Sequence, residues 1–241
     1  MAAYVLIPGA GGDPWEWHLL TAELESRGHD VLPVRLPAGD ESAGWSEYAA
    51  AVVEAIEDRG DVILVAQSLA GFTAALVAQQ VPVDLIVLLN AMIPLPGETG
   101  NEWWANTGQH EAEQAYFASI GLPPDTADDE VAVYMHDVPP EVVQEAASRI
   151  PEQTMTPMEQ PWPLESWPDV PTRVLIGRDD RLFPAKFQVR IAKERLGLDG
   201  DTDRRRPHDG PEPPRGARRT AGGLSPPAGM ISHGECSGPT D

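Results

Sequence analysis

Short apolar runs alternate with longer helix-like segments along the first part of the chain. The predicted strands are Tyr4–Ile7, Val31–Leu36, Val62–Val65, Asp84–Leu89 and, much later, Thr172–Ile176. The predicted helices between the early strands are Trp15–Arg27, Trp45–Asp58 and Leu69–Gln80. Strands that alternate with helices of this length indicate βαβ units, and therefore an α/β fold with a mostly parallel sheet flanked by helices.

The pattern changes between residues 94 and 171, where no clear strand is found and acidic helix-like pieces alternate with prolines. We expect this stretch to be a helical cap inserted into a core made of residues 1–93 and 172–203. Two interpretations of its tryptophans stay open: they line an apolar acyl or aryl pocket, or they fix the cap to the core. These tryptophans are Trp103, Trp104, Trp162 and Trp167.

Residues 204–241 form an aberrant tail that is rich in Arg, Pro, Gly and Ser and has no hydrophobic period. Such a composition cannot bury enough apolar surface to offset the entropy of ordering it. The sequence therefore predicts that this tail is mostly disordered or loosely attached.

Composition narrows the class of protein. The 241 residues carry a net charge of -21, which argues against nucleic acid or an anionic membrane as a partner. No apolar run approaches the roughly 18 residues of a membrane span, and the N-terminus shows no signal-peptide pattern. The single cysteine, Cys236, excludes an intrachain disulfide. We expect a cytoplasmic protein whose oligomeric state the sequence leaves open.

The segment Val62–Gly71 carries the clearest chemical signal. An apolar run ends in small-x-Ser-x-small, and a helix-forming run follows, as in a nucleophile elbow with Ser68 at the apex. The positions two before and two after the serine must be small because strand and helix almost touch there, and here they are Ala66 and Ala70. The alternative is a buried strand leading into a helix that merely contains a serine.

A serine nucleophile needs an oxyanion hole and an orienting acid. The glycine-rich loop Pro8–Gly12 follows the first strand, so the backbone N–H groups of Ala10 and Leu69 are the expected oxyanion pair. A phosphate cradle is less consistent with this loop, because neither G-x-G-x-x-G nor a P-loop lysine is present. Two aspartates after the last predicted strand compete as the acid, and we favour Asp180 over Asp179; the alternative is a solvated acidic turn.

Together these motifs resemble the α/β-hydrolase superfamily, in particular its compact esterase and hydroxynitrile-lyase-like branch. The resemblance covers roughly residues 3–200 and rests on the segments Leu6–Gly12, Trp15-x-Trp17, Gly28–Val31, Val62–Gly71 and Asp179–Gln188. It implies a serine hydrolase acting on small esters, with Ser68 as nucleophile, Asp180 as acid, and no metal or organic cofactor. Pro8 and Gln67 stand where the family often has histidine.

Two other functions remain possible. Some non-catalytic small-molecule receptors have the same fold. A chain without a working catalytic base would bind small molecules without converting them. Cyanohydrin lyase chemistry usually needs a lysine near the site, and Lys186 and Lys193 follow the acid loop. We rank the lyase lowest.

The catalytic histidine is the weak point of the resemblance. The family places it after a last strand, as Gly-Gly-His followed by an apolar pair, and no such segment is present. His208 stands about where the family's base falls, but its surroundings carry no strand pattern. The remaining histidines, expected to be structural, solvated or in the cap or tail, are His18, His29, His110, His136 and His233.

A shifted reading frame explains the tail. If the first two codon bases of residues 205–224 are kept and the third left free, a one-base shift permits GGHMMALSRPEELAERLVAY. This sequence has the family's histidine loop, a serine suited to a helix N-cap and an amphipathic helix. We hypothesise a frameshift, in the gene or in its recorded sequence, that removes the last strand, the histidine loop and the last helix. The sheet edge that this leaves uncovered favours self-association.

Overall fold

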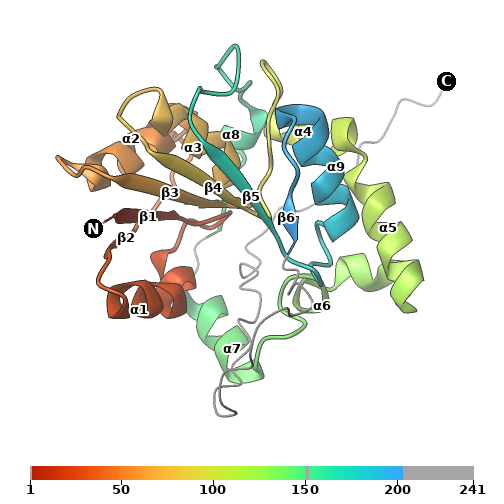
Figure 1. Cartoon of the computed structure of the whole chain (residues 1–241). Helices are drawn as coiled ribbons and strands as arrows, with labels where there is room; N and C mark the ends of the chain where they lie inside the picture. Colours follow the sequence, from red (N-terminus) through yellow and green to blue (C-terminus); the bar gives the residue numbers. More distant parts are fainter. Residues whose placement is uncertain (1, 150–151, 203–241) are drawn as a thin grey trace, which may run out of the picture.

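The computed structural model describes residues 2–149 and 152–202, and its centre is a single sheet (Figure 1). The strands lie in the order β2-β1-β3-β4-β5-β6, and all neighbouring pairs are parallel. Their bounds are β1 Ala3–Ile7, β2 Asp30–Pro33, β3 Val62–Gln67, β4 Leu85–Leu89, β5 Thr172–Ile176 and β6 Asp201–Thr202. The predicted α/β class with a parallel sheet is confirmed.

Two strands differ from the expectation. β2 ends at Pro33; the next amide, Val34, still donates to Leu6 O of β1 at 3.0 Å, and the Leu36 amide then donates to Gly12 O, in the loop after β1, at 3.0 Å. The expectation that the chain lacks its last strand was wrong, because a short strand of two residues is present. β6 pairs Asp201 and Thr202 with β5 and is the last described element of the chain.

The helices connect these strands. The first helix is preceded by a 3-10 turn, η1, where the sequence predicted the first turn of a longer helix. The Asp13 carboxylate accepts from the Trp15 amide at 2.8 Å and so starts this turn. The bounds are η1 Pro14–Trp17, α1 His18–Ser26, α2 Trp45–Ile56, α3 Ala70–Ala78, α4 Gly100–Thr107, α5 Gln109–Ile120, η2 Pro124–Asp128, α6 Glu130–Tyr134, α7 Pro140–Arg149, α8 Thr156–Glu159 and α9 Ala185–Leu196.

The two faces of the sheet are covered very differently. We call the face under α2, α3 and α9 the packed face; its strand residues, such as Leu64, Ile86 and Val174, belong to the main hydrophobic core. The other face carries α1, whose neighbourhood forms a small separate core of Leu6, Trp17 and Val65. Figure 1 shows α1 below the sheet and α2 and α3 above it.

Between residues 94 and 171 the described part of the chain contains α4 to α8 and η2 but no strand longer than the isolated bridge between Thr99 and Pro161. Trp103 and Trp162 are fully buried, and their indole N–H groups donate to Ile93 O and Phe72 O at 3.0 and 3.1 Å. These two tryptophans therefore fix the segment to the core.

None of the described helices is long and apolar enough to cross a membrane. The predicted tail, residues 204–241, lies outside the described residues.

Candidate active site

Ser68 occupies the turn between β3 and α3 in a strained backbone conformation. Its φ is +50°, a region that residues other than glycine seldom adopt. The flanking Ala66 and Ala70 are both buried. At Gly71 an added Cβ would lie 1.9 Å from Met92 O, so only glycine fits where α3 starts. The local structure is thus that of the predicted elbow.

The loop after β1 lies directly beside this serine. Parallel pairing places Ile7 opposite Ala66, so the chain leaves β1 and β3 at the same edge of the sheet. A Cβ placed on Gly9 would be 3.1 Å from Ser68 Cβ and 3.7 Å from its Oγ. Within the described part of the chain, the amides of Ala10 and Leu69 donate no hydrogen bond, which leaves both available to a ligand.

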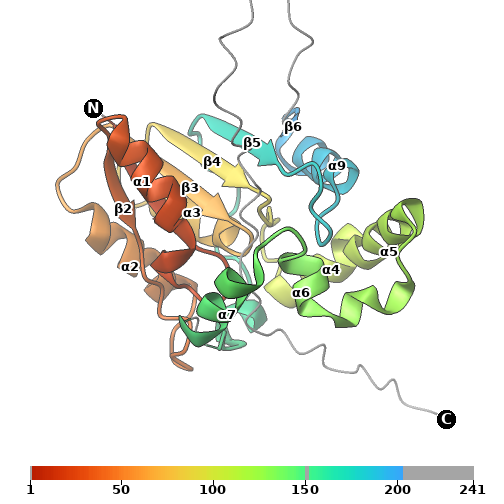
Figure 2. The ribbon, with the colours of Figure 1, turned by 90° about the horizontal axis from the view of Figure 1, so that it is seen from below.

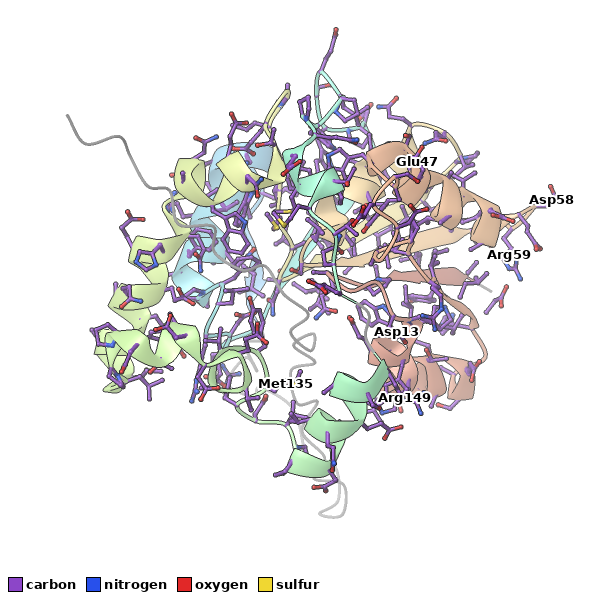
Figure 3. All side chains as sticks on the ribbon, turned by 180° about the vertical axis from the view of Figure 1, so that it is seen from behind. Asp13, Glu47, Asp58, Arg59, Met135 and Arg149 are labelled. Atoms are coloured by element: carbon purple, nitrogen blue, oxygen red, sulfur yellow. The ribbon has the colours of Figure 1, made fainter. Side chains whose placement is uncertain are left out.

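Residues from far along the chain hold this loop in place. The buried Gln153 accepts from the Gly11 amide at 3.2 Å and donates to the Tyr48 hydroxyl at 2.8 Å. The end of α7 packs on η1, with the Arg149 guanidinium 5.6 Å from the centre of the Trp15 ring. Figure 3 shows Arg149 beside the turn that carries Asp13. Two segments therefore hold the loop in place: one ends just before residues 150 and 151, and the other begins just after them.

The acid loop follows β5 and brings Asp180, rather than the exposed Asp179, to the same pocket as Ser68. The Asp180 carboxylate accepts from the Phe183 amide at 2.7 Å. Burial raises the pKa of Asp180 to about 6, although hydrogen bonds from the Phe183 and Leu182 amides oppose the shift; the charge of Asp137 adds to it. A carboxyl in this setting gains from a cationic partner, because such a partner would restore its ionised form.

The pocket is small, with a cavity volume of about 10 Å³, the space of one water molecule. Its lining is Gln67, Ser68, Asn90, Val133, Tyr134, Asp180, Leu182 and Phe183. The tryptophans of the segment 94–171 do not line it; α6 reaches it instead. An ester that binds here must displace side chains that line the pocket.

Asn90 is a pocket residue that the sequence reasoning missed. It has a φ of +43°, and its Oδ1 accepts from the Gly177 amide at 2.6 Å, which ties the end of β4 to the end of β5. A polar residue directly after a buried strand was the available signal, since the carboxyl ends of parallel strands meet at one edge. Tyr134 of α6 had no such signal.

A second carboxyl group lies buried near the pocket. Glu113 of α5 is 5% exposed, and burial raises its pKa to about 7 in spite of a hydrogen bond from Gln109; the charge of Asp180 raises it further. Burial also raises the pKa of Tyr134, with the charges of Glu113, Glu130 and Asp180 adding to the effect. This end of the site is therefore acidic and dry.

Glu16 is a third buried acid, behind the loop after β1. It is 5% exposed, and its pKa is raised well above the usual value, first by burial and then by the charge of Asp13. The Gly9 amide favours its ionised form and opposes the shift. Glu16 thus lies buried beside the loop that carries Gly9.

No described histidine hydrogen-bonds to Ser68 or Asp180. His136 comes nearest along the acid loop, with its Nε2 3.1 Å from Asp179 O. His18 contacts its own turn, His29 contacts Tyr4, and His110 is 4.0 Å from Glu113. The predicted base, His208, lies outside the described residues.

Among the described residues no cluster of three or more His, Cys, Asp or Glu side chains could hold a metal ion. The described residues bring a strained serine, a buried carboxyl and two backbone amides to one edge of the sheet.

Comparison with known proteins shows the family to which the chain belongs. A family model described as "Alpha/beta hydrolase family" matches residues 4–212. An α/β hydrolase of Aspergillus novofumigatus is 26% identical over 213 residues, which are 81% of this chain and 84% of that protein. Methylesterase 7 of Arabidopsis thaliana is 34% identical over 104 residues, 38% of this chain and 40% of that one. The solved structure of polyneuridine aldehyde esterase has a TM-score of 0.64 at 18% identity, covering 84% of this chain and 89% of its own.

Proposed function

The chain belongs to the α/β-hydrolase family, and from that premise we propose that it is a serine hydrolase of small carboxylic esters. The observation that carries the proposal is the strained Ser68 in one pocket with Asp180, beside the loop of Gly9 and Ala10. The names methylesterase and polyneuridine aldehyde esterase among the similar proteins support esters as the substrate class.

The proposed reaction has two steps. Ser68 Oγ attacks the ester carbonyl while a histidine takes its proton, and the amides of Ala10 and Leu69 bind the oxyanion. The tetrahedral intermediate collapses, the alcohol leaves with the proton from that histidine, and the acyl group stays on Ser68. Water, deprotonated by the same histidine, then releases the acid and restores Ser68. Asp180 orients the imidazole and stabilises its cationic form.

We propose His208 as the base, on its distance in sequence from Asp180. A second function is supported by one observation: within residues 2–149 and 152–202 no histidine forms a hydrogen bond or ion pair with Ser68 or Asp180. A chain without a working base would bind small molecules and turn them over poorly. The lyase has less support, because neither Lys186 nor Lys193 lines the pocket and Lys193 pairs with Asp199 at 3.0 Å. A cytoplasmic location stays a prediction.

Hydrolysis of p-nitrophenyl acetate tests the proposal. We expect Ser68→Ala to lower kcat at least about 1,000-fold, because removing a nucleophile removes the covalent route. The exposed Ser46→Ala is the matched control and should leave the rate unchanged. Equal rates for the wild-type chain and Ser68→Ala would contradict the hydrolase and leave the binding protein.

Paired variants identify the acid and the base. Asp180→Asn should cost on the order of 1,000-fold or more in kcat, whereas its neighbour Asp179→Asn should cost little, since only Asp180 lines the pocket. His208→Ala should abolish the serine-dependent rate, and His136→Ala should retain it. The reverse result for the two histidines would assign the base to His136, and loss in neither would remove histidine from the mechanism.

A further inference from the structure

Asn90 lines the same pocket as Ser68 and shares its unusual backbone conformation. The φ of Asn90 is +43° and that of Ser68 is +50°. Among the described residues other than glycine, only Glu57 and Asp61 also have a positive φ, and neither of them lines the pocket. Strain of this kind persists only where the surrounding structure imposes it. The contacts of Asn90 therefore show what this conformation provides.

The backbone around Asn90 is hydrogen-bonded to the nucleophile on one side and to the strand of the acid loop on the other. Leu89 O accepts from the Ser68 amide at 3.3 Å, and the Met92 amide donates to Ser68 O at 2.9 Å. The Asn90 amide donates in the other direction, to Leu175 O of β5 at 3.0 Å. The turn after β4 therefore lies between the two elements whose relative position the reaction depends on (Figure 2).

The Asn90 side chain holds the first residue of the acid loop. Its Oδ1 accepts from the amide of Gly177, which follows β5 directly and stands three positions before Asp180. A Cβ added to Gly177 would lie 2.8 Å from Asn90 Nδ2, so the close approach requires glycine. Asp180 in turn accepts from the Phe183 amide at the far end of the loop. A shift of Gly177 would therefore move Asp180 relative to Ser68.

The core supports the segment that carries Asn90. Three residues further on, Ile93 O accepts from the indole N–H of the fully buried Trp103 at 3.0 Å and also from the guanidinium of Arg195. Asn90 is thus attached to a part of the molecule that is fixed from several elements. A side chain supported in this way is suited to hold a neighbouring loop precisely.

We propose that Asn90 is a positioning residue, which keeps Asp180 in place relative to Ser68 by joining the turn beside the nucleophile to the start of the acid loop. This inference rests on the proposed hydrolase function, because it assigns Asn90 a role that acts through Asp180. A merely structural asparagine would join β4 to β5 without any specific effect on Asp180. The experiments below separate these two roles.

Amide hydrogen exchange tests the contact without any reliance on catalysis. Asn90→Gly removes the acceptor but suits the positive φ, so the fold should be retained. We expect the Gly177 amide, followed by NMR, to exchange at least about tenfold faster in this variant. Asn90→Asp keeps an oxygen in the position of Oδ1 and should retain the slow exchange. Unchanged exchange in Asn90→Gly would overturn the proposal.

Hydrolysis of p-nitrophenyl acetate tests whether the contact acts through Asp180. Asn90→Gly should lower kcat by about 10- to 100-fold through misplacement of the acid, with KM changed less than about threefold. Asn90→Asp should retain most of kcat. In an Asp180→Asn background, Asn90→Gly should cause no further loss, because residues that act as a unit are not additive. An equal loss in both backgrounds would assign Asn90 a role apart from Asp180 and overturn the proposal.

Two further variants complete this comparison. Asn101→Gly, at an exposed asparagine of α4, is the matched control and should change neither kcat nor the exchange of the Gly177 amide. Gly177→Ala keeps the test decisive if Asn90→Gly fails to fold, because the new Cβ would press on Asn90 Nδ2. It should lower kcat only where Asp180 is present. A loss that persists in the Asp180→Asn background would contradict the proposed role.

Titration of the Asp180 carboxyl by NMR separates this proposal from the hydrolase itself. If the chain shows no hydrolysis that depends on Ser68, the proposed function fails, and the titration decides the role of Asn90 alone. Burial raises the pKa of Asp180 to about 6. In Asn90→Gly the loosened loop should admit water, and the pKa of Asp180 should fall toward its usual value of about 3.9. An unchanged pKa of Asp180 in Asn90→Gly would overturn the proposal.

Discussion

The two faces of the sheet differ in how far the described chain completes them. The packed face is covered by α2, α3 and α9, and large side chains such as Trp103 and Phe72 fill it completely. The opposite face has α1 over one part, a core of three buried residues, and the exposed Leu175 beyond it. Within the described residues, the packed face is therefore covered by helices up to Leu196, whereas the opposite face leaves Leu175 exposed.

The site shows a related division. The described residues bring Ser68, the loop of Gly9 and Ala10, and Asp180 together at one edge of the sheet. The proposed base, His208, lies outside the described residues.

The largest effect is expected where a charge pair supports the packed face. Arg195 of α9 and Glu98 are almost fully buried, with Arg195 Nη2 2.9 Å from Glu98 Oε1. Burial alone would raise the pKa of Glu98, but hydrogen bonds from Arg195, Asn106 and the Leu95 amide and the charge of Arg195 outweigh it, so the pKa is lowered. Arg195→Met should cost about 3–5 kcal/mol in urea unfolding, because it leaves a buried carboxylate without its partner.

Arg27→Met is the matched control on the opposite face. The Arg27–Glu23 pair on α1 is exposed, and its loss should cost no more than about 1 kcal/mol. Equal losses of stability in the two variants would mean that the two faces of the sheet contribute equally to stability, and would contradict the difference described above.

A pair of leucines compares the two faces within neighbouring strands. Leu88 of β4 is fully buried on the packed face, so Leu88→Ala should cost about 2–5 kcal/mol through the lost contacts and the cavity. Leu175 of β5 points to the opposite face and is 41% exposed, so Leu175→Ala should change stability by no more than about 0.5 kcal/mol. A large loss of stability in Leu175→Ala would show that other parts of the chain cover this side chain.

A smaller effect is expected from the buried acid of α5. The pKa of Glu113 is raised to about 7, against about 4.3 in an unfolded chain. The folded state therefore holds an extra proton between these values, and the free energy of unfolding should fall as pH rises from about 4 to 7. The raised pKa of Asp180 acts in the same direction.

Glu113→Gln should flatten this fall, since the amide cannot lose a proton. The exposed Glu111→Gln on the same helix is the control and should reproduce the wild-type slope. Thermal melts across this pH range measure the difference, and an identical slope in Glu113→Gln would rule out Glu113 as its source.

The sequence predicted the parts of the site that local patterns determine. The strands, the elbow of Ser68 and the position of Asp180 are evident from apolar runs that end in small or acidic residues, and the alternation of strands and helices led to the parallel sheet. Local patterns say nothing of distant partners, so Asn90 and Tyr134 were missed: they reach the pocket only because β4 ends beside β5 and α6 folds back. The brace of Gly11 by Gln153, far along the chain, is of the same kind.

Covalent labelling of the protein with a fluorophosphonate probe tests the proposed serine nucleophile most directly. We expect the label on the peptide that contains Ser68, and we expect Ser68→Ala to abolish it. A label on another residue, or labelling that survives Ser68→Ala, would contradict the proposal.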